Sequence, residues 1–564
     1  MRSTGEGSAT GRVRCAPVEG AAALFTADFV DYLARLHDEF GPRAGALRRT
    51  RASVLERALR DGVLPGPLAS GAVTNGPWRV PPVPADLARP GIEISGPCSI
   101  TSMFINALNP GPDGERAEGD LDDDEDSGGH RLVDSVRACH NRLAAVNHEL
   151  TYRDQERGRD YRIAPGELPF FMHRERGLHL DEPEVTVDGT PVVAAILGSA
   201  LTLYYPGRAQ ADRGQGIYFY LPKVESAEEC AWYRDLFDRS RELLPALHAA
   251  QIRAIPLVES LPAVYQMEEM LHALGPYAAG LNAARWDLKA SIFEFVMADP
   301  ASVWPDRFGV DIKTTPFLAD IFRRLVAICL KRGAVPIGGM ATALPNPDPE
   351  VNRVAAETIR ADKVWEAEQG FVRAWVAHIF HMKTAADPFR ELAASGWRPS
   401  AAMAQPENYP IRIEVPAGSI TIEGTRRNAR MLIEYAEGWL GGRGAKGIDS
   451  LAGKPGIHPA LMEDLATGRM SAAQIAQRIR HRARTTAGPA SVHDEALVKR
   501  LLTEECDDIL ARLGPDEVAL GPRYRDALKV ALRWIKNYVE LDFRSLATYT
   551  RDDLARIASS PDAF

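Results

Sequence analysis

The chain has 564 residues, and its 67 basic and 76 acidic side chains give a formal net charge of −9. Hydrophobic residues make up 45% of the chain and charged residues 25%, close to the average for soluble globular proteins. This length suffices for two to four domains, or for one large barrel with additions. The mild negative charge argues against a nucleic-acid-binding or membrane-surface protein, because such proteins carry a basic binding face.

Six cysteines lie far apart and form no CxxC pair, which argues against a thiolate zinc site and thioredoxin-like chemistry. A disulfide framework is not expected in a chain this long, so we predict a reducing, cytoplasmic location. The first 20 residues lack the apolar core of a signal peptide. The apolar segment 192–203 is too short to span a bilayer, so no membrane association is expected.

The first part of the chain predicts helices and a linker. Residues 1–24 are expected to be a flexible tail. Apolar residues from Thr26 onward recur at spacings of three and four, and a second helical pattern covers 46–60. The proline-rich stretch 78–91 predicts extended chain.

A different rhythm follows, in which short apolar runs alternate with helical stretches. This alternation predicts a parallel sheet that helices cover on both faces, and eight runs favour a (β/α)8 barrel, hence an α/β fold. The predicted strands are 92–96, 102–108, 168–173, 217–222, 253–259, 278–283, 334–340 and 374–380.

From about Ile420 the pattern is nearly all helical. We therefore predict an N-terminal tail and helical clasp over 1–90, a barrel over 91–415 and a helical domain over 416–564. The one charge run, 112–129, is expected to be a solvated acidic loop. It is no calcium loop, because Glu125 stands where glycine is needed and Arg131 where the final glutamate is needed.

Barrel enzymes carry their active residues at the carboxyl ends of the strands. Charged residues follow several predicted strands: Arg174 and Arg176, Lys223, Glu259, and Asp287. Oxygen ligands from Glu259 and Asp287 suit magnesium, with substrate and water completing its octahedral coordination.

Several passages together resemble the A-type malate synthase family over nearly the whole chain. They include WRVPPVPADL, RERGLHL, IYFYLPKVES, GLNAARWD, GGMATALP and LMEDLATGRMS. The resemblance implies a TIM barrel with an N-terminal helical clasp and a C-terminal helical domain. It also implies an acyltransferase that condenses acetyl-CoA with glyoxylate and then hydrolyses the thioester, giving malate and CoA.

The resemblance also implies roles for single residues. Asp464 in LMED corresponds to the catalytic base, and Arg176 in RERG to the arginine that stabilises the enolate. Glu259 and Asp287 correspond to the ligands of Mg²⁺.

Further positions follow from the same resemblance. Ala284, Arg285 and Trp286 correspond to the loop that cradles glyoxylate. Asp123 and Glu125 correspond to an acidic passage after the second strand, although an insertion there leaves the register open.

The chain departs from the family around these positions. Ala284 replaces a glycine, and Leu288, Lys289 and Ala290 replace Tyr, Ile and Phe. The passage Val372–Ala374, Ile379 and Leu465 also differ from the family pattern. We expect the smaller residues to free volume behind the metal site, and Arg373 and Ile379 to reshape the acyl-CoA entrance.

Two alternatives therefore remain beside acetyl-CoA and glyoxylate. One keeps the chemistry but uses another 2-oxo acid or acyl-CoA in specialised metabolism. The other is a non-catalytic barrel protein, which the joint presence of Arg176, Glu259, Asp287 and Asp464 argues against.

Overall fold

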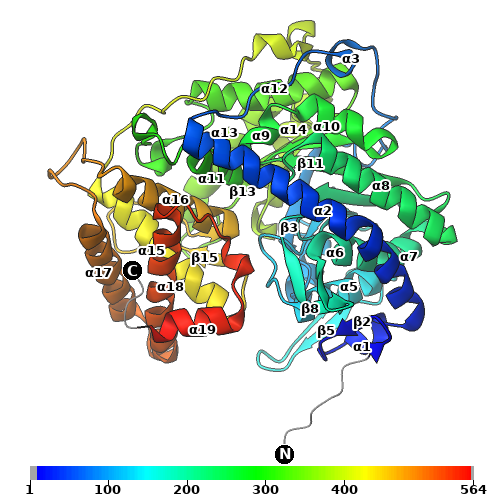
Figure 1. Cartoon of the computed structure of the whole chain (residues 1–564), viewed down its shortest axis with the longest axis horizontal. Coiled ribbons are helices and arrows are strands. Elements are labelled where there is room, and N and C mark those ends of the chain that lie inside the picture. Colours follow the sequence, from blue (N-terminus) through cyan, green and yellow to red (C-terminus); the bar gives the residue numbers. More distant parts are fainter. Residues whose placement is uncertain (1–8, 561–564) are drawn as a thin grey trace, which may run out of the picture.

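A closed barrel of eight parallel strands forms the centre of the computed structural model, which describes residues 9–560 (Figure 1). The predicted (β/α)8 barrel is confirmed. Around the barrel the strands are β3 (Gly91–Pro97), β4 (Gly119–Asp123), β7 (Phe170–Arg174), β10 (Ile217–Leu221), β11 (Ile252–Val258), β12 (Gly280–Ala283), β13 (Val335–Ala341) and β14 (Arg373–Val376), with β14 pairing back to β3.

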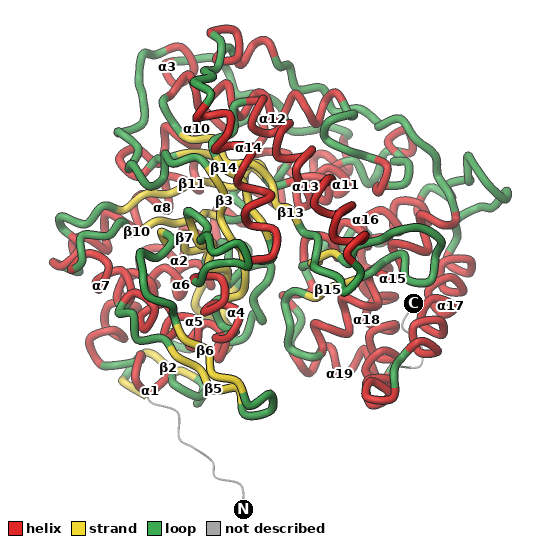
Figure 2. The backbone as a smooth tube through the Cα atoms, turned by 180° about the vertical axis from the view of Figure 1, so that it is seen from behind, coloured by secondary structure: helices red, strands yellow, loops and turns green. Residues whose placement is uncertain are grey.

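Helices follow the strands and cover the outside of the barrel, as the alternating pattern predicts (Figure 2). They are α4 (Thr101–Leu108), α5 (Leu132–Val146), α6 (Ala194–Tyr204), α7 (Pro206–Asp212), α8 (Ala227–Leu243), α9 (Leu261–Val264), α10 (Met267–Leu274), α11 (Arg285–Phe295), α12 (Pro316–Arg332), α13 (Pro349–Gln369) and α14 (Met382–Ala394). A hairpin of β5 (Thr151–Asp154) and β6 (Arg159–Arg162) lies between α5 and β7.

The second barrel strand is not where the apolar run predicts it. The segment 102–108 lies within helix α4, with Phe104, Ile105 and Leu108 buried at spacings of three and four. A short, mostly apolar segment fits a buried helix face as well as a strand, and periodicity alone does not separate the two.

The actual second strand, β4, lies inside the acidic run 112–129, so the prediction of a solvated loop is wrong. Every residue of β4 is buried. Asp122 has two buried basic partners: Arg142 Nε donates to it at 2.6 Å, and His173 Nδ1 lies 2.7 Å from its other oxygen. Basic partners that come from distant parts of the chain make an acidic strand stable in the barrel.

A buried polar cluster lies inside the barrel near the start of β14. Glu93 accepts hydrogen bonds from Arg373 Nε at 2.8 Å, Tyr220 Oη at 2.7 Å and Trp375 Nε1 at 3.1 Å. Because Arg373 is the first residue of its strand, it lies at the amino end of the barrel. The expectation that Arg373 shapes an entrance at the carboxyl end is therefore wrong.

The N-terminal region contains a single long helix, α2 (Ala27–Asp61), instead of two. It lies across α6 and α8 on the outside of the barrel (Figure 1). The short helix α3 (Ala72–Asn75) follows it. Part of the predicted tail is ordered: β1 (Ala9–Thr10), β2 (Val13–Cys15) and α1 (Ala21–Leu24) precede α2, while residues 1–8 lie outside the described part.

The first strands belong to a small sheet that the sequence does not predict. The antiparallel order is β1-β2-β8-β9, in which β8 (Asp181–Val187) and β9 (Thr190–Val193) come from the segment after barrel strand β7. The N-terminal segment is therefore held to the barrel by backbone hydrogen bonds.

The C-terminal part is helical, as predicted, and packs beside the barrel (Figures 1 and 2). Its helices are α15 (Ile422–Leu440), α16 (Leu465–Arg480), α17 (Glu495–Arg512), α18 (Gly521–Val539) and α19 (Arg551–Ser559). A two-stranded sheet of β15 (Lys446–Ile448) and β16 (Leu461–Glu463) lies among them. Among the described residues, no helix is sufficiently long and apolar to cross a bilayer.

The strand β16 connects the C-terminal part to the barrel mouth. The backbone N–H of Met462 donates to the carbonyl of Thr342 at 2.7 Å, and that of Leu344 donates to the carbonyl of Ala460 at 2.8 Å. Thr342 follows β13 directly, so these bonds hold β16 at the carboxyl end of the barrel. The division into 1–90, 91–415 and 416–564 remains a prediction.

Candidate active site

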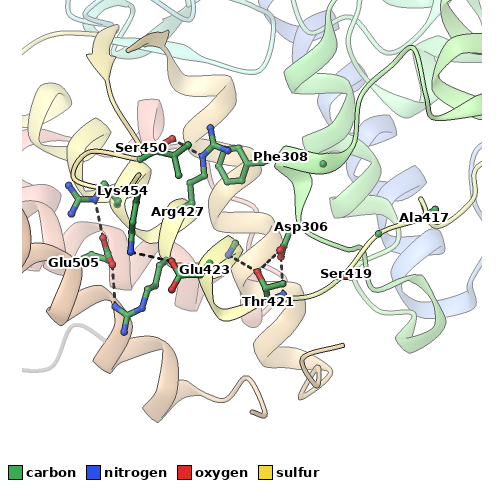
Figure 3. A pocket seen from close by; sticks show the side chains of 16 residues that line it. Asp306, Phe308, Ala417, Ser419, Thr421, Glu423, Arg427, Ser450, Lys454 and Glu505 are labelled. Atoms are coloured by element: carbon green, nitrogen blue, oxygen red, sulfur yellow. Dashed lines mark hydrogen bonds and ion pairs between the residues drawn. The ribbon is translucent and has the colours of Figure 1, made fainter. Parts of the chain in front are cut away.

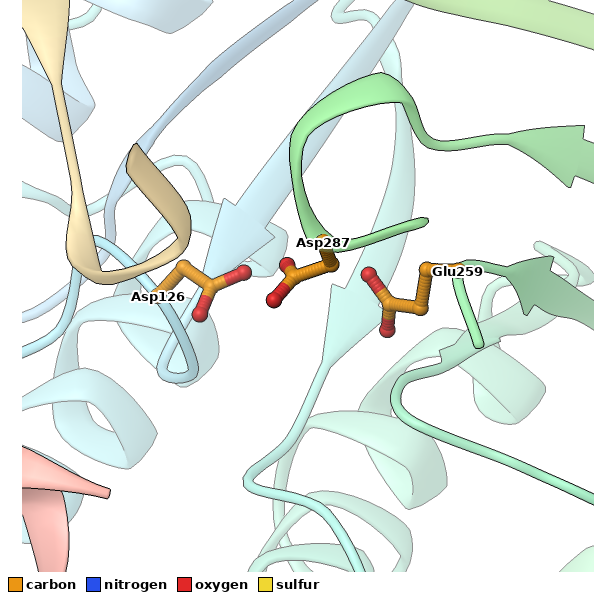
Figure 4. Close-up of side chains that lie close together, drawn as sticks. All are labelled: Asp126, Glu259 and Asp287. Carbon is orange, nitrogen blue, oxygen red and sulfur yellow. The ribbon is translucent and has the colours of Figure 1, made fainter. Parts of the chain in front are cut away.

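Three buried carboxylates converge at the carboxyl end of the barrel (Figure 4). Asp126 follows β4, Glu259 follows β11, and Asp287 lies in the first turn of α11 after β12. One oxygen from each lies within 4.8 Å of the others. The two residues predicted as metal ligands are thus brought together, and the acidic run supplies a third.

Lys223, just after β10, lies at the centre of the carboxylate cluster. Its Nζ lies 2.7 Å from Asp287, 2.9 Å from Asp126, 3.2 Å from Glu125 and 3.7 Å from Glu259. Arg469 Nη1 also donates to Asp287, at 3.1 Å, but the same guanidinium pairs with Glu294. The four carboxylates around Lys223 therefore outnumber the positive charges that are free to neutralise them.

This excess fits a divalent cation. Burial, together with the nearby charges of Asp287 and Asp126, raises the pKa of Glu259 against the opposing charge of Lys223. Oxygen Oε1 of Glu125 is buried without a hydrogen-bond partner in the described part of the chain. Convergent carboxylate oxygens with unused acceptor capacity match the ligands that hard cations prefer.

Arg174, the last residue of β7, provides a fixed positive charge beside the carboxylates. Its guanidinium donates two hydrogen bonds to Asp123, at 2.7 and 2.6 Å, and its Nη1 lies 3.8 Å from Asp126. The backbone and side chain of Ser127 also donate to Asp123, at 2.9 and 2.6 Å. The orientation of Arg174 is therefore set by a buried anion.

Arg176 lies elsewhere. Its Nη2 donates to Glu182 at 2.6 Å and to Ser135 at 3.2 Å, and the residue lines neither of the cavities beside the carboxylates. The expectation that Arg176 faces Asp464 is not met by this geometry. The end of the strand separates the two arginines: Arg174 is the last residue of β7 and shares the inward face of Met172, whereas Arg176 lies beyond β7.

Asp464 lies between β16 and α16, where the C-terminal part reaches the barrel mouth. It is also the N-cap of α16, since its Oδ1 accepts from the backbone N–H groups of Ala466 and Thr467 at 3.1 and 3.4 Å. Burial, then the charges of Asp126 and Asp287, raise the pKa of Asp464 well above its ordinary value. The cap fixes a carboxylate that has a high proton affinity.

Residues 284–286 open helix α11 beside the carboxylates. Ala284 is its N-cap position, and all three residues line the same small cavity. Arg285 forms ion pairs with Asp362 and Glu366, which hold its guanidinium against α13. The first N–H groups of a helix have no partner inside the helix, so this turn can bind a carboxylate.

Two of the cavities beside the carboxylates adjoin one another. The first, here called the carboxylate cavity, has a volume of about 40 Å³ and is lined by residues that include Asp126, Glu259, Asp287 and Trp286. The second, the methionine cavity, has about 20 Å³ and is lined by Met103, Met340 and Met462 among others. Arg174 and Asp464 line both cavities, so they stand at the boundary between the two.

The residues that depart from the family after Asp287 do not line these cavities. Leu288, Lys289 and Ala290 are buried within α11, which packs against α16. Lys289 is not solvated: its Nζ donates to the carbonyl of Val310 at 2.7 Å and lies 4.9 Å from the centroid of the Trp286 ring. The expected free volume behind the metal site is therefore absent from the lining of the carboxylate cavity.

The sequence does not predict Asp126 as a site residue, because the charge pattern of 112–129 is typical of a solvated loop. The signal was available in the acidic passage of the resemblance, since the residue stands beside Glu125 in the sequence DDDEDS.

Comparisons with known proteins give one consistent result. The family model "Malate synthase, TIM barrel domain" matches residues 170–408, and "Malate synthase, C-terminal" matches 419–551. Malate synthase A of Escherichia coli K12 is 32% identical, with 93% of this chain and 95% of the relative covered. Malate synthase of Streptomyces clavuligerus is 36% identical, covering 92% and 94%. Malate synthase of Oryza sativa subsp. japonica is 33% identical, covering 94% and 92%.

Proposed function

We infer the activity of this chain from the fact that it belongs to the malate synthase family. It is an acyltransferase that condenses acetyl-CoA with glyoxylate and hydrolyses the thioester to malate and CoA. The main support for the mechanism proposed below is the position of Arg174 and Asp464 on the boundary between two cavities. A group in one cavity can react there with a group in the other.

In the proposed mechanism Asp464 is the base that removes a proton from the acetyl methyl group. Its raised pKa suits this task, because a carboxylate with high proton affinity is a stronger base. The hydrogen bonds from the first turn of α16 hold the carboxylate in place.

Arg174, rather than Arg176, is proposed to stabilise the negative charge that develops on the thioester oxygen. A guanidinium remains protonated at any working pH, so it supplies fixed charge without exchanging a proton. The pair with Asp123 prevents Arg174 from turning away while the charge develops.

Asp126, Glu259 and Asp287 are proposed to hold Mg²⁺. When bound there, Mg²⁺ would polarise the aldehyde oxygen of glyoxylate. The backbone N–H groups that open α11 at Ala284, Arg285 and Trp286 are proposed to bind the carboxylate of glyoxylate. The acetyl group of acetyl-CoA is proposed to reach Asp464 from the side of the methionine cavity.

A thiol-release assay tests the proposal directly. The chain, acetyl-CoA, glyoxylate and Mg²⁺ are expected to release CoA thiol and form malate in equal amounts, and omission of either substrate is expected to abolish the release. Thiol release that does not depend on glyoxylate would show a simple thioesterase and contradict the proposal.

A further inference from the structure

A cavity between the barrel and the C-terminal helices lies apart from the candidate active site. It has a volume of about 460 Å³ and shares no lining residue with the carboxylate cavity or the methionine cavity. Phe308, in the short 3-10 helix Arg307–Gly309 between α11 and α12, lines the cavity together with Arg427 of α15 (Figure 3). The segment 417–421, which connects the barrel to the C-terminal helices, borders it.

The guanidinium of Arg427 has no carboxylate partner in the described part of the chain. The Nε donates to Ser450 Oγ at 2.8 Å, and Cζ lies 3.7 Å from the centroid of the Phe308 ring. Among residues 9–560, no carboxylate lies within 4 Å of its nitrogens, and no hydrogen-bond partner accepts from Nη1 or Nη2. Burial lowers the pKa of Arg427, although Glu463 and Asp449 act in the opposite direction.

The neighbouring cations differ from Arg427, because carboxylates neutralise them. Arg430 pairs with Glu505 at 3.0 Å. Lys454 lies 3.3 Å from Glu423, and both side chains are exposed, so this pair is weak and Lys454 can turn toward a ligand. The cavity thus offers one fixed unpaired guanidinium and one mobile ammonium group.

We propose that this cavity binds a small organic anion through a carboxylate or phosphate group on Arg427. A guanidinium forms two parallel hydrogen bonds with such groups, and Arg427 has two terminal nitrogens available for them. The aromatic ring of Phe308 fixes the plane of the guanidinium, and Ser450 fixes its Nε edge. The remaining volume accommodates the rest of the molecule, with Lys454 as a second contact.

A ligand in this cavity contacts the barrel and the C-terminal part at once, since Phe308 and Arg427 belong to different sides. Arg427 and Arg307 are also the cations whose charges act on Glu463, the residue before Asp464. Bound anion therefore stabilises the arrangement of the two parts that carries Asp464 to the barrel mouth.

Thermal unfolding of the full chain tests the proposal, with inorganic phosphate in one arm and succinate in the other. Sodium chloride at matched ionic strength is the reference, because it reveals non-specific salt effects. The midpoint temperature of unfolding of the wild type is expected to rise when either anion is added. Above the dissociation constant, it is expected to keep rising with the logarithm of the anion concentration. The arm with the larger shift identifies phosphate or carboxylate as the preferred group.

Arg427→Gln is expected to abolish the shift, whereas Arg500→Gln, which removes an exposed arginine outside the cavity, is expected to retain it. Arg174→Gln is expected to retain it as well, because Arg174 lines only the candidate active site. Absence of a shift in wild type beyond that of sodium chloride overturns the proposal, as does an equal shift in Arg427→Gln.

Arg427→Lys provides a second variant if Arg427→Gln does not fold. It keeps the positive charge but loses the two-pronged geometry, so the shift is expected to fall by about half or more. An unchanged shift in Arg427→Lys would also contradict the assignment.

Discussion

Arg174 and Asp123 form a buried ion pair with two hydrogen bonds, from Nε to Oδ1 at 2.7 Å and from Nη2 to Oδ2 at 2.6 Å. Both residues end neighbouring barrel strands, and their Cα atoms are partners in the register of β4 and β7. The backbone and the side chains therefore fix the same guanidinium. This relationship distinguishes Arg174 from Arg176, which is paired with Glu182 away from the two cavities.

Arg174→Lys is expected to lower kcat by about 10²-fold or more, because lysine cannot keep both bonds to Asp123 and also face the developing charge. Arg176→Lys is the matched control, with the same substitution two residues along the chain, and is expected to retain most of kcat. Steady-state thiol release measures both. A larger loss of kcat in Arg176→Lys than in Arg174→Lys would instead assign the stabilisation of the enolate to Arg176.

Asp123→Asn is expected to reduce the free energy of unfolding by about 3 kcal/mol at pH 7, because it leaves the Arg174 charge buried and unpaired. Urea unfolding measures this loss. Ser127, which also donates to Asp123, provides a milder comparison as Ser127→Ala. A stability loss below that of Ser127→Ala would contradict the role of the pair.

The same pair predicts a pH dependence. Burial alone would raise the pKa of Asp123, but the charge and hydrogen bonds of Arg174 and Ser127 outweigh it and lower the pKa to about 2. Because the unfolded value is higher, near 3.8, the stabilisation is fully present above about pH 4 and is lost as pH falls toward 2. The stability difference between wild type and Asp123→Asn should therefore shrink over this window and stay constant between pH 5 and 7.

Asp464→Asn is expected to slow the exchange of the acetyl methyl protons by roughly 10²–10⁴-fold, because the variant has no base. Its free energy of unfolding is expected to stay near that of the wild type. Asparagine caps a helix as well as aspartate, so the bonds to Ala466 and Thr467 survive. Asp464→Ala loses the base and the cap, and should lower the free energy of unfolding by about 1 kcal/mol in addition. Near-normal exchange in Asp464→Asn would show that the residue is a cap alone.

Glu259→Gln and Asp287→Asn are each expected to weaken Mg²⁺ binding by about ten-fold or more, because each removes a charged oxygen ligand. Calorimetric titration with Mg²⁺ alone measures this without dependence on activity. Asp160→Asn, in the exposed hairpin of β5 and β6, is the matched control. Equal Mg²⁺ affinity in all three variants would contradict the assignment of a metal site to this cluster.

Glyoxylate is expected to be preferred over pyruvate and 2-oxobutyrate, with kcat/KM falling about ten-fold or more for each added carbon. The carboxylate cavity is small, and Trp286, Met340 and Trp375 close it. A panel of 2-oxo acids with acetyl-CoA measures the preference. Preference for 2-oxobutyrate would instead support the alternative acceptor in specialised metabolism.

Most of the barrel was predictable from local patterns, but one strand was not. Seven apolar runs give strands because burial on both faces leaves a continuous apolar signature, as in β10 and β11. β4 carries three aspartates and has no such signature. The strand is stabilised by Arg142, His173 and Arg174, which belong to other elements. No local sequence pattern therefore predicts β4.

The sequence by itself determined the residue types of the site and the order of the elements that carry them. Motif resemblance predicted Glu259, Asp287 and Asp464 as site residues, because short passages keep their spacing when the fold is kept. Only the tertiary structure placed Arg174, and not Arg176, beside the carboxylates, brought Asp126 to them, and buried Lys289 against Trp286. These outcomes depend on contacts between segments far apart in the chain, where burial and charge pairing, rather than local periodicity, set the free energy of each side-chain position.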